Sequence, residues 1–202
     1  MNRRTLGCLF ELLETLLLTL AIFLVIQVFI AQPYQVPMTS MENTLMPGQY
    51  VLVDKLTPNF DDYHRGDVVV FNPPLGAPQN PSGAPYLKRV IGVAGDTVDI
   101  HGGHVYVNGK QMTEAYVYEN QTTDMSDGGS KTWTLATNQL FVMDDHRQDP
   151  ASQDSRDFGP IARSSVIGRA WLRYWPLGNF GLLPQAKQSS APGSSPLPSK
   201  VP

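Results

Sequence analysis

The sequence contains little that could cross-link it, bind a metal or attract a nucleic acid. Its single cysteine, Cys8, excludes a disulfide within the chain and is compatible with any redox compartment. The formal net charge is -3 and the basic residues form no run, so we expect no nucleic-acid partner. His101 and His104 flank a Gly-Gly pair and are predicted to be surface residues of a hairpin turn rather than zinc ligands. With 42% hydrophobic residues, the 202-residue chain can still build the core of one domain.

One long apolar segment is present, near the N-terminus. Residues 15–31 are uncharged and consist mostly of Leu, Ile, Phe and Val, with further apolar residues before them. Such a segment reaches the roughly 20 residues of a membrane-spanning helix. The alternative is a cleaved secretory signal, which has an apolar core of about 7–15 residues and small residues before the cut. The length of the segment, and the bulky Phe29 two positions before Ala31, favour an uncleaved anchor in the lipid bilayer.

The basic residues predict how this anchor is oriented. Arg3 and Arg4 precede the apolar segment, whereas the first basic residue after it is Lys55. Because basic residues are retained on the cytoplasmic side, the N-terminus is expected to be cytoplasmic and the chain after residue 31 to lie outside.

Short strands separated by turns are predicted for the rest of the chain. No ten-residue stretch after the anchor shows helical periodicity, so we expect a mainly β domain of the barrel or sheet type. Residues 72–85 contain five prolines and two glycines and are predicted to be a loop. The end of the chain is rich in Ser and Pro and is predicted to be disordered. We therefore divide the chain into an anchor at 1–31, a domain at 32–184 and a tail at 185–202. The predicted strands are 49–56, 67–71, 86–93, 97–100, 104–107, 133–135, 139–143 and 166–175.

Two residues could together carry nucleophilic chemistry. Ser40 follows the anchor closely, and a serine hydroxyl becomes a nucleophile when a neighbouring base takes its proton. Lys88 stands in an otherwise apolar strand, where burial without a counter-charge would disfavour its ammonium form. Strand alternation places Lys88 and Arg89 on opposite faces, so Arg89 can find a carboxylate elsewhere while Lys88 is desolvated.

Spacing alone leaves other interpretations open. A lone serine is usually a turn residue, and a lysine in a strand usually points to solvent. A Ser-His-Asp triad is also available, because the chain has four histidines and thirteen aspartates, although none of the histidines is singled out by its surroundings.

Four segments in order behind the anchor resemble bacterial type I signal peptidases, the membrane-bound serine–lysine proteases that remove signal peptides from exported proteins. The segment 166–170 and the Trp175-Pro176 pair also resemble the last strand of that family. The four segments are Val36-Pro37-x-x-Ser40-Met41-x-x-Thr44-Leu45, Gly66-Asp67-Val68-Val69-Val70-Phe71, Tyr86-Leu87-Lys88-Arg89-Val90-Ile91-Gly92-x-x-Gly95-Asp96 and Ser152-x-Asp154-Ser155-Arg156-x-Phe158-Gly159.

The resemblance implies a role for each matched residue. Ser40 would be the nucleophile and Lys88 the general base. Ser152 would orient the lysine amine, with Ser155 as the alternative. Met41 would help to form the substrate pocket, and the Ser40 backbone N–H would donate to the oxyanion. The implied structural ion pairs are Arg89 with Asp145 and Arg156 with Asp154.

The sequence departs from the family pattern at several positions. Met38 stands where many members have a serine that supplies the second oxyanion donor, and the adjacent Thr39 could replace it only if it pointed the right way. The family's Gly-Asp-Asn-Arg is Asp144-Asp145-His146-Arg147 here. Asn43 stands where proline is common. The loop before Ser152 is about two residues longer than usual, which makes the match of Ser152 less secure than that of Lys88.

The implied function is the removal of signal peptides from secretory preproteins that carry small residues before the cleavage site. The implied location is the bacterial cytoplasmic membrane, with a single-pass anchor and an extracytoplasmic catalytic domain, and neither metal nor cofactor is implied. Two alternatives remain: a scaffold built on a decayed protease, and a serine–lysine peptidase with one dedicated substrate.

Overall fold

The computed structural model describes residues 3–74, 85–125, 128–149 and 153–184. Most of the predicted loop at 72–85, the predicted tail at 185–202 and Ser152 lie outside the described residues.

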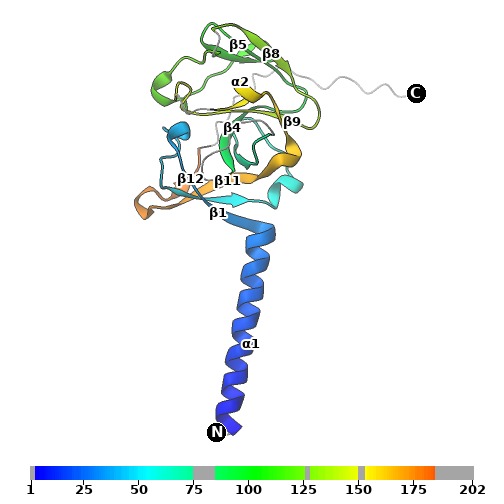
Figure 1. Cartoon of the computed structure of the whole chain (residues 1–202), viewed down its shortest axis with the longest axis vertical. Helices are drawn as coiled ribbons and strands as arrows, with labels where there is room; N and C mark the ends of the chain where they lie inside the picture. Colours follow the sequence, from blue (N-terminus) through cyan, green and yellow to red (C-terminus); the bar gives the residue numbers. More distant parts are fainter. Residues whose placement is uncertain (1–2, 75–84, 126–127, 150–152, 185–202) are drawn as a thin grey trace, which may run out of the picture.

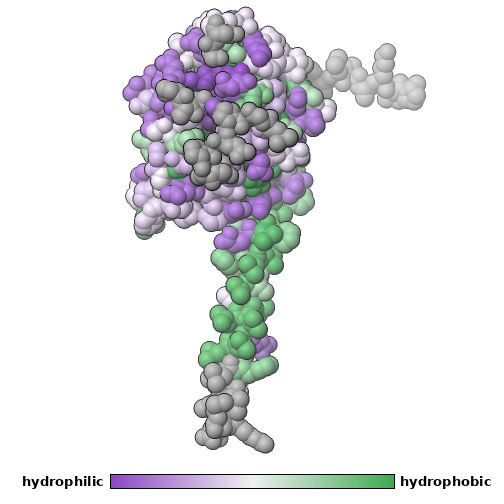
Figure 2. Space-filling view, in the orientation of Figure 1, coloured by the Kyte–Doolittle hydropathy of each residue, from purple (hydrophilic) through white to green (hydrophobic). Residues whose placement is uncertain are grey.

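A helix rises from the domain and carries the apolar segment (Figure 1). Helix α1 spans Arg3–Val25 and continues as a π-helical turn, η1, over Ile26–Ile30. The 21 residues Phe10–Ile30 are apolar enough to cross a membrane, and none of them is buried against the protein. The hydroxyls of Thr15 and Thr19 each donate to the carbonyl four residues earlier, at 2.8 Å, so these polar groups are satisfied within the helix. The hydrophobic colour of this helix in Figure 2 contrasts with the mixed surface of the domain.

The larger sheet has eight strands and begins directly after this helix. Strand β1 pairs only with β2, so it forms an edge, and an edge strand tolerates Pro33, which lacks a backbone N–H. All neighbouring strands are antiparallel. The strand order is β1 (Ala31–Gln35), β2 (Tyr50–Asp54), β11 (Val166–Trp175), β3 (Val68–Phe71), β4 (Tyr86–Gly92), β9 (Gln139–Met143) and β10 (Ile161–Ala162), and β12 (Gly181–Leu182) pairs with β11.

The smaller sheet lies at the end of the domain away from α1 (Figure 1). Its antiparallel order is β7 (Lys110–Gln111), β6 (His104–Val107), β5 (Thr97–His101) and β8 (Lys131–Thr134). The predicted hairpin around the Gly-Gly pair joins β5 to β6, and His101 stacks on Tyr106 with ring centroids 4.2 Å apart.

Three short helical segments and one α-helix complete the part of the domain that concerns the site. The 3-10 turn η2 (Thr39–Met41) carries Ser40, and α2 (Ser155–Phe158) is capped by Asp154. The turns η3 (Thr57–Asn59) and η6 (Leu177–Asn179) follow β2 and β11. Two further 3-10 turns are η4 (Tyr118–Asn120) and η5 (Arg163–Ser165).

One cluster of buried apolar side chains fixes the segment around Ser40. Val36, Met41 and Leu45 are all buried and pack with residues of β2, β3 and β11 in one cluster. A second cluster joins β9 to the smaller sheet, and a third fills the space between β3, β4, β9 and β10. The segment that carries Ser40 is therefore held by the core rather than displayed on a mobile loop.

The prediction of a mainly β domain behind one apolar helix is confirmed. The predicted strands are present with boundaries shifted by a few residues, and β11 spans the predicted range. The sequence analysis did not predict β1, the short α2, or the two-residue strands β7, β10 and β12.

Gly168 in β11 offers a test of how closely this sheet is packed. A Cβ atom at this position would lie 2.3 Å from the carbonyl oxygen of Asp54 and 2.8 Å from Cγ1 of Val53. Overpacking of this kind costs about 1–3 kcal/mol, so Gly168→Ala should lower the free energy of unfolding by about that amount in urea denaturation. The matched control is Gly178→Ala, where a Cβ would meet nothing within 4 Å. Equal stability of the two variants would show that β11 and β2 can separate freely at this point.

Candidate active site

Ser40 is held in the turn between β1 and β2. Ser40 is buried, and its backbone carbonyl accepts a hydrogen bond from the His146 backbone N–H at 3.0 Å. Val36 exchanges backbone hydrogen bonds with Gln49 and Gly48 across the ends of this turn, at 2.8 and 2.9 Å. The turn is thus bonded at both ends and to the segment after β9.

Lys88 lies at the centre of β4, a strand with β3 on one side and β9 on the other. All seven residues of β4 are buried, and Lys88 is among them. The amine Nζ lies 3.4 Å from the hydroxyl Oγ of Ser40. The structure thus brings the two predicted catalytic residues into hydrogen-bond distance.

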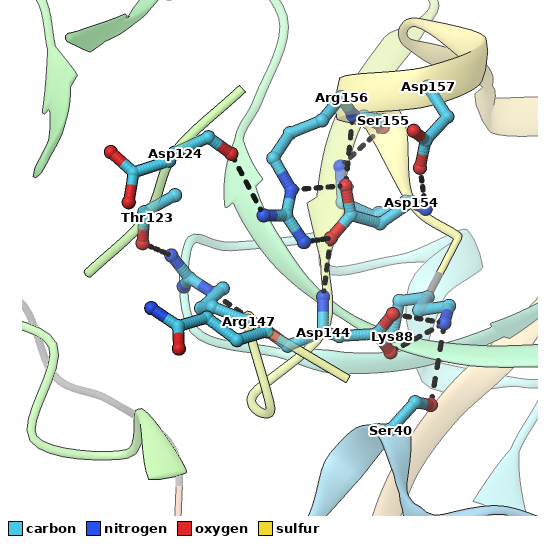
Figure 3. A network of polar contacts seen from close by, with 12 residues as sticks. Ser40, Lys88, Thr123, Asp124, Asp144, Arg147, Asp154, Ser155, Arg156 and Asp157 are labelled. Atoms are coloured by element: carbon cyan, nitrogen blue, oxygen red, sulfur yellow. Dashed lines mark hydrogen bonds and ion pairs between the residues drawn. The ribbon is translucent and has the colours of Figure 1, made fainter. Parts of the chain in front are cut away.

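The expectation that Lys88 is buried without a counter-charge is wrong. Its Nζ donates to both carboxylate oxygens of Asp144, each at 2.5 Å, and both side chains are almost completely buried. The amine lies between this carboxylate and the Ser40 hydroxyl (Figure 3). Asp144 stands where the family has glycine, which has no side chain, so the departure could be noted in the sequence but its contact with Lys88 could not.

The predicted pair of Arg89 and Asp145 is present and is part of a larger network. Two parallel hydrogen bonds of 2.8 and 2.7 Å join the guanidinium to the carboxylate, and both side chains are fully buried. The Thr44 hydroxyl lies 2.9 Å from Arg89 Nη2 and 2.5 Å from Asp145 Oδ2. Burial alone would lower the pKa of Arg89, but the charge and hydrogen bonds of Asp145 outweigh it and hold that pKa above its ordinary value. Thr44 therefore ties the segment that carries Ser40 to β4 and to the residues after β9.

The predicted pair of Asp154 and Arg156 is also present, and Asp154 bonds to the backbone of Asp144. The carboxylate receives two bonds from the guanidinium, at 3.0 and 2.9 Å, and accepts from the Asp144 backbone N–H at 3.1 Å (Figure 3). Burial alone would raise the pKa of Asp154, but the charge and hydrogen bonds of Arg156 hold that pKa below its usual range.

The residue predicted to orient Lys88, Ser152, lies outside the described residues. The alternative, Ser155, is buried at the start of α2, and its hydroxyl accepts a hydrogen bond from the Val142 backbone N–H at 2.9 Å. Among the described residues, the group that directly contacts the amine opposite Ser40 is the Asp144 carboxylate.

A small pocket, of about 20 Å³, opens beside the two predicted catalytic residues. Residues 36–38, 40 and 41 line one side, and residues 85–88 line the other. Met41 is buried against this pocket, as the resemblance implies for a wall residue. Apolar walls on both sides suit small, uncharged side chains.

Two residues near Ser40, Thr39 and Asn43, bear on the departures from the family pattern. The Thr39 hydroxyl donates to Asp149 Oδ2 at 2.6 Å, so it is directed toward that carboxylate. Asn43 has φ of 82°, which a proline with φ near -65° cannot adopt, and its side chain donates to the Tyr116 carbonyl at 3.1 Å. The turn here therefore differs in backbone conformation from one built on proline.

The geometry distinguishes a serine–lysine pair from the Ser-His-Asp triad, the two kinds of hydrolase site that the sequence left open. A Ser-His-Asp triad would need an imidazole at Ser40, but the ring of His146 is directed at Glu42, 3.4 Å away, and at the Tyr118 ring, 4.5 Å away. The arrangement fits a serine–lysine hydrolase that follows an apolar anchor.

The comparisons with known proteins identify the particular family. The family model described as signal peptidase, peptidase S26, matches residues 9–175. The chain belongs to this family of serine endopeptidases, which remove signal peptides. It is 34% identical to a signal peptidase I of Leptolyngbya laminosa, over 87% of this chain and 84% of that protein. It is 32% identical to a probable signal peptidase I-2 of a Synechocystis strain, over 92% of this chain and 82% of that protein. A crystal structure of a signal peptidase I from Enterococcus faecalis, 27% identical, covers 54% of this chain and 97% of its own with a TM-score of 0.40.

The pair of Arg89 and Asp145 generates a stability prediction. Asp145→Asn removes the carboxylate charge and leaves a fully buried guanidinium uncompensated, which typically costs about 3–5 kcal/mol. We expect that loss in the free energy of unfolding, measured by urea denaturation of the detergent-solubilised chain. The control is Asp62→Asn, because Asp62 pairs with Arg163 at the surface, and such pairs are worth about 0–1 kcal/mol. A similar loss in both variants would contradict the structural role of the buried pair.

Proposed function

We propose that this signal peptidase cleaves preproteins with Ser40 as the nucleophile and Lys88 as the general base. The observation that carries the proposal is the 3.4 Å approach of the Lys88 amine to the Ser40 hydroxyl in a buried site. A nucleophile and its base must lie within hydrogen-bond reach, and this contact is somewhat long, as is common in sites without substrate.

The proposed reaction has two halves. In the first, the neutral Lys88 amine takes the Ser40 proton as the hydroxyl oxygen attacks the scissile carbonyl, and the Ser40 backbone N–H donates to the oxyanion. The protonated lysine then gives its proton to the leaving amine, and an acyl-enzyme remains. In the second half, Lys88 takes a proton from water, whose oxygen attacks the ester. The Lys88 ammonium returns this proton to the Ser40 oxygen as the ester bond breaks, and the signal peptide is released. Met38 supplies no second side-chain donor to the oxyanion.

The substrate would bind as an extended chain in the pocket between residues 36–41 and 85–88. An extended peptide can pair with exposed strand backbone, and pockets then select alternate side chains. The apolar walls that include Met41 support a preference for small residues one and three positions before the cut.

The membrane arrangement follows from the apolar surfaces at one end of the protein. The hairpin of β11, η6 and β12 lies at the same end of the domain as α1 (Figure 1). Its large apolar side chains are exposed, and they are Trp171, Trp175, Leu177, Phe180 and Leu182. We place this end of the domain against the outer surface of a bacterial cytoplasmic membrane. Arg3 and Arg4 before the helix support a cytoplasmic N-terminus.

The catalytic assignment predicts that Ser40→Ala and Lys88→Ala abolish cleavage of a preprotein with an Ala-x-Ala site. Loss of either group removes a step that the other cannot supply, so we expect a loss of more than about 10³-fold in detergent solution, measured by N-terminal sequencing and product yield. Ser164→Ala and Lys110→Ala make the same changes in exposed residues and should retain activity.

The outcomes of that experiment distinguish the alternatives. If wild type and the variants are all folded and equally inactive on every preprotein, the result would favour a scaffold. Selective cleavage of one preprotein, with accumulation of that one alone on depletion, would favour a dedicated substrate.

The membrane assignment predicts that the double change Leu177→Ser and Phe180→Ser impairs cleavage in proteoliposomes. Burial of a large apolar side chain is worth about 1.5–3 kcal/mol, and about 1.4 kcal/mol changes an equilibrium constant tenfold. We therefore expect the cleavage rate to fall at least about tenfold. Cleavage of a short soluble peptide should be unchanged. Tyr106→Ser, an aromatic change on the distant smaller sheet, is the control. If the double variant and wild type were equally active in proteoliposomes, the proposed contact of the hairpin with the membrane would be contradicted.

A further inference from the structure

Asp144 introduces a charge where the proposed general base should be neutral. Its two carboxylate oxygens each lie 2.5 Å from the Lys88 amine, whereas the Ser40 hydroxyl lies 3.4 Å from it. The side chains of Lys88 and Asp144 are 3% and 0% exposed, so water screens their interaction very little. An isolated aspartate binds its proton near pH 3.9 and an isolated lysine near pH 10.4, so the proton of such a pair belongs to the amine over the neutral range.

The backbone on both sides of Asp144 is fixed. Its N–H donates to Asp154 Oδ2 at 3.1 Å, and its carbonyl accepts from Arg147 Nε at 2.6 Å. The residue directly follows β9, so the strand sets its direction. The carboxylate is therefore a fixed part of the site.

The other charged and titratable groups around the pair are engaged with partners of their own. Arg156 bonds to Asp154 through two nitrogens, and Arg147 pairs with Glu114 at 2.5 Å. The positive charge of Lys88 is in turn one of the causes that lower the pKa of Asp154. On β4 itself, the Tyr86 ring centroid lies 5.3 Å from the Lys88 amine, and burial together with the Asp144 charge raises the pKa of the Tyr86 hydroxyl.

We propose that Asp144 is a positioning residue that holds Lys88 as an ammonium ion in the free enzyme and thereby restricts cleavage to alkaline conditions. The proposal rests on the Ser40–Lys88 chemistry above and adds the step that must precede it. The Lys88 ammonium gives one proton to solvent water or hydroxide, and the neutral amine then takes the Ser40 proton as Oγ attacks the carbonyl. Asp144 remains a carboxylate throughout, and it aligns the amine through its two hydrogen bonds.

The first test is the pH dependence of kcat/KM for wild type and Asp144→Asn with the same preprotein. An opposite charge typically shifts a titration by about 1–3 pH units, so the wild-type activity should rise mainly above about pH 9. At pH 7, kcat/KM of Asp144→Asn should exceed that of wild type by about tenfold or more. Each pH unit by which the titration moves changes the fraction of neutral amine about tenfold. Asp144→Glu keeps the charge and should keep the alkaline profile. Asp99→Asn removes a carboxylate from the smaller sheet and should match wild type.

Two results would contradict the proposal. One is a pair of superimposable profiles for wild type and Asp144→Asn. The other is a loss of activity in Asp144→Asn at every pH while the protein remains folded by circular dichroism, which would mean that the carboxylate itself takes part in the chemistry. If Asp144→Asn does not fold, the wild-type profile still decides, because a plateau that begins at neutral pH is incompatible with a lysine held as ammonium.

The second test reads the proton on Lys88 without any turnover. The chain contains six lysines, so selective labelling of the lysine ε-carbon with carbon-13 gives a small set of NMR signals. The Lys88 signal is assigned by its disappearance in Lys88→Arg. At pH 8.5 we expect an ammonium signal in wild type, and a titration midpoint at least one pH unit lower in Asp144→Asn. A neutral-amine signal in wild type at that pH would overturn the proposal. Failure to cleave any preprotein would instead contradict the proposed function and leave this measurement valid.

Discussion

Neutralisation of the buried Arg89 guanidinium is the interaction on which the arrangement of the site depends. Arg89 is fully buried, and its nitrogens donate to the Asp145 carboxylate, the Thr44 hydroxyl and the carbonyls of Gly66 and Pro184. These acceptors come from four separate parts of the chain: the end of β9, the segment after Ser40, the turn before β3 and the segment after β12. A buried cation without these acceptors would be strongly destabilising, so folding brings the four parts together around it.

Two consecutive cations on β4 meet two consecutive anions after β9. Lys88 pairs with Asp144 and Arg89 pairs with Asp145. Because side chains alternate along a strand, each pair lies on its own side of the sheet, one at the nucleophile and one in the structural network. The same strand geometry therefore supplies both the stability of the domain and the electrostatics of its site.

The sequence predicted the fold better than it predicted the charges of the site. Strands such as β3, β4 and β11 are Val-rich or strongly apolar runs, and their composition identifies them. β1 contains Pro33 and polar residues, and it is a strand because the edge of a sheet tolerates them, which depends on the position of β2 and β11. The ion pairs of Arg89 and Arg156 could be predicted because the resemblance carries them. The contact of Asp144 with Lys88 could not, because it depends on where the chain turns after β9, and no local pattern encodes that direction.

The residue after η1 is already the first residue of β1. Ala31 is paired with Asp54, so no free linker separates the apolar helix from the sheet. A tilt or rotation of the helix is therefore transmitted to the strand that leads to Ser40, and the domain cannot swing about a flexible tether. With the helix in a bilayer, the proposed nucleophile Ser40 is held at one height above the lipid. Under the proposed mechanism, the rigid connection sets the distance from the bilayer at which a peptide bond can be cleaved.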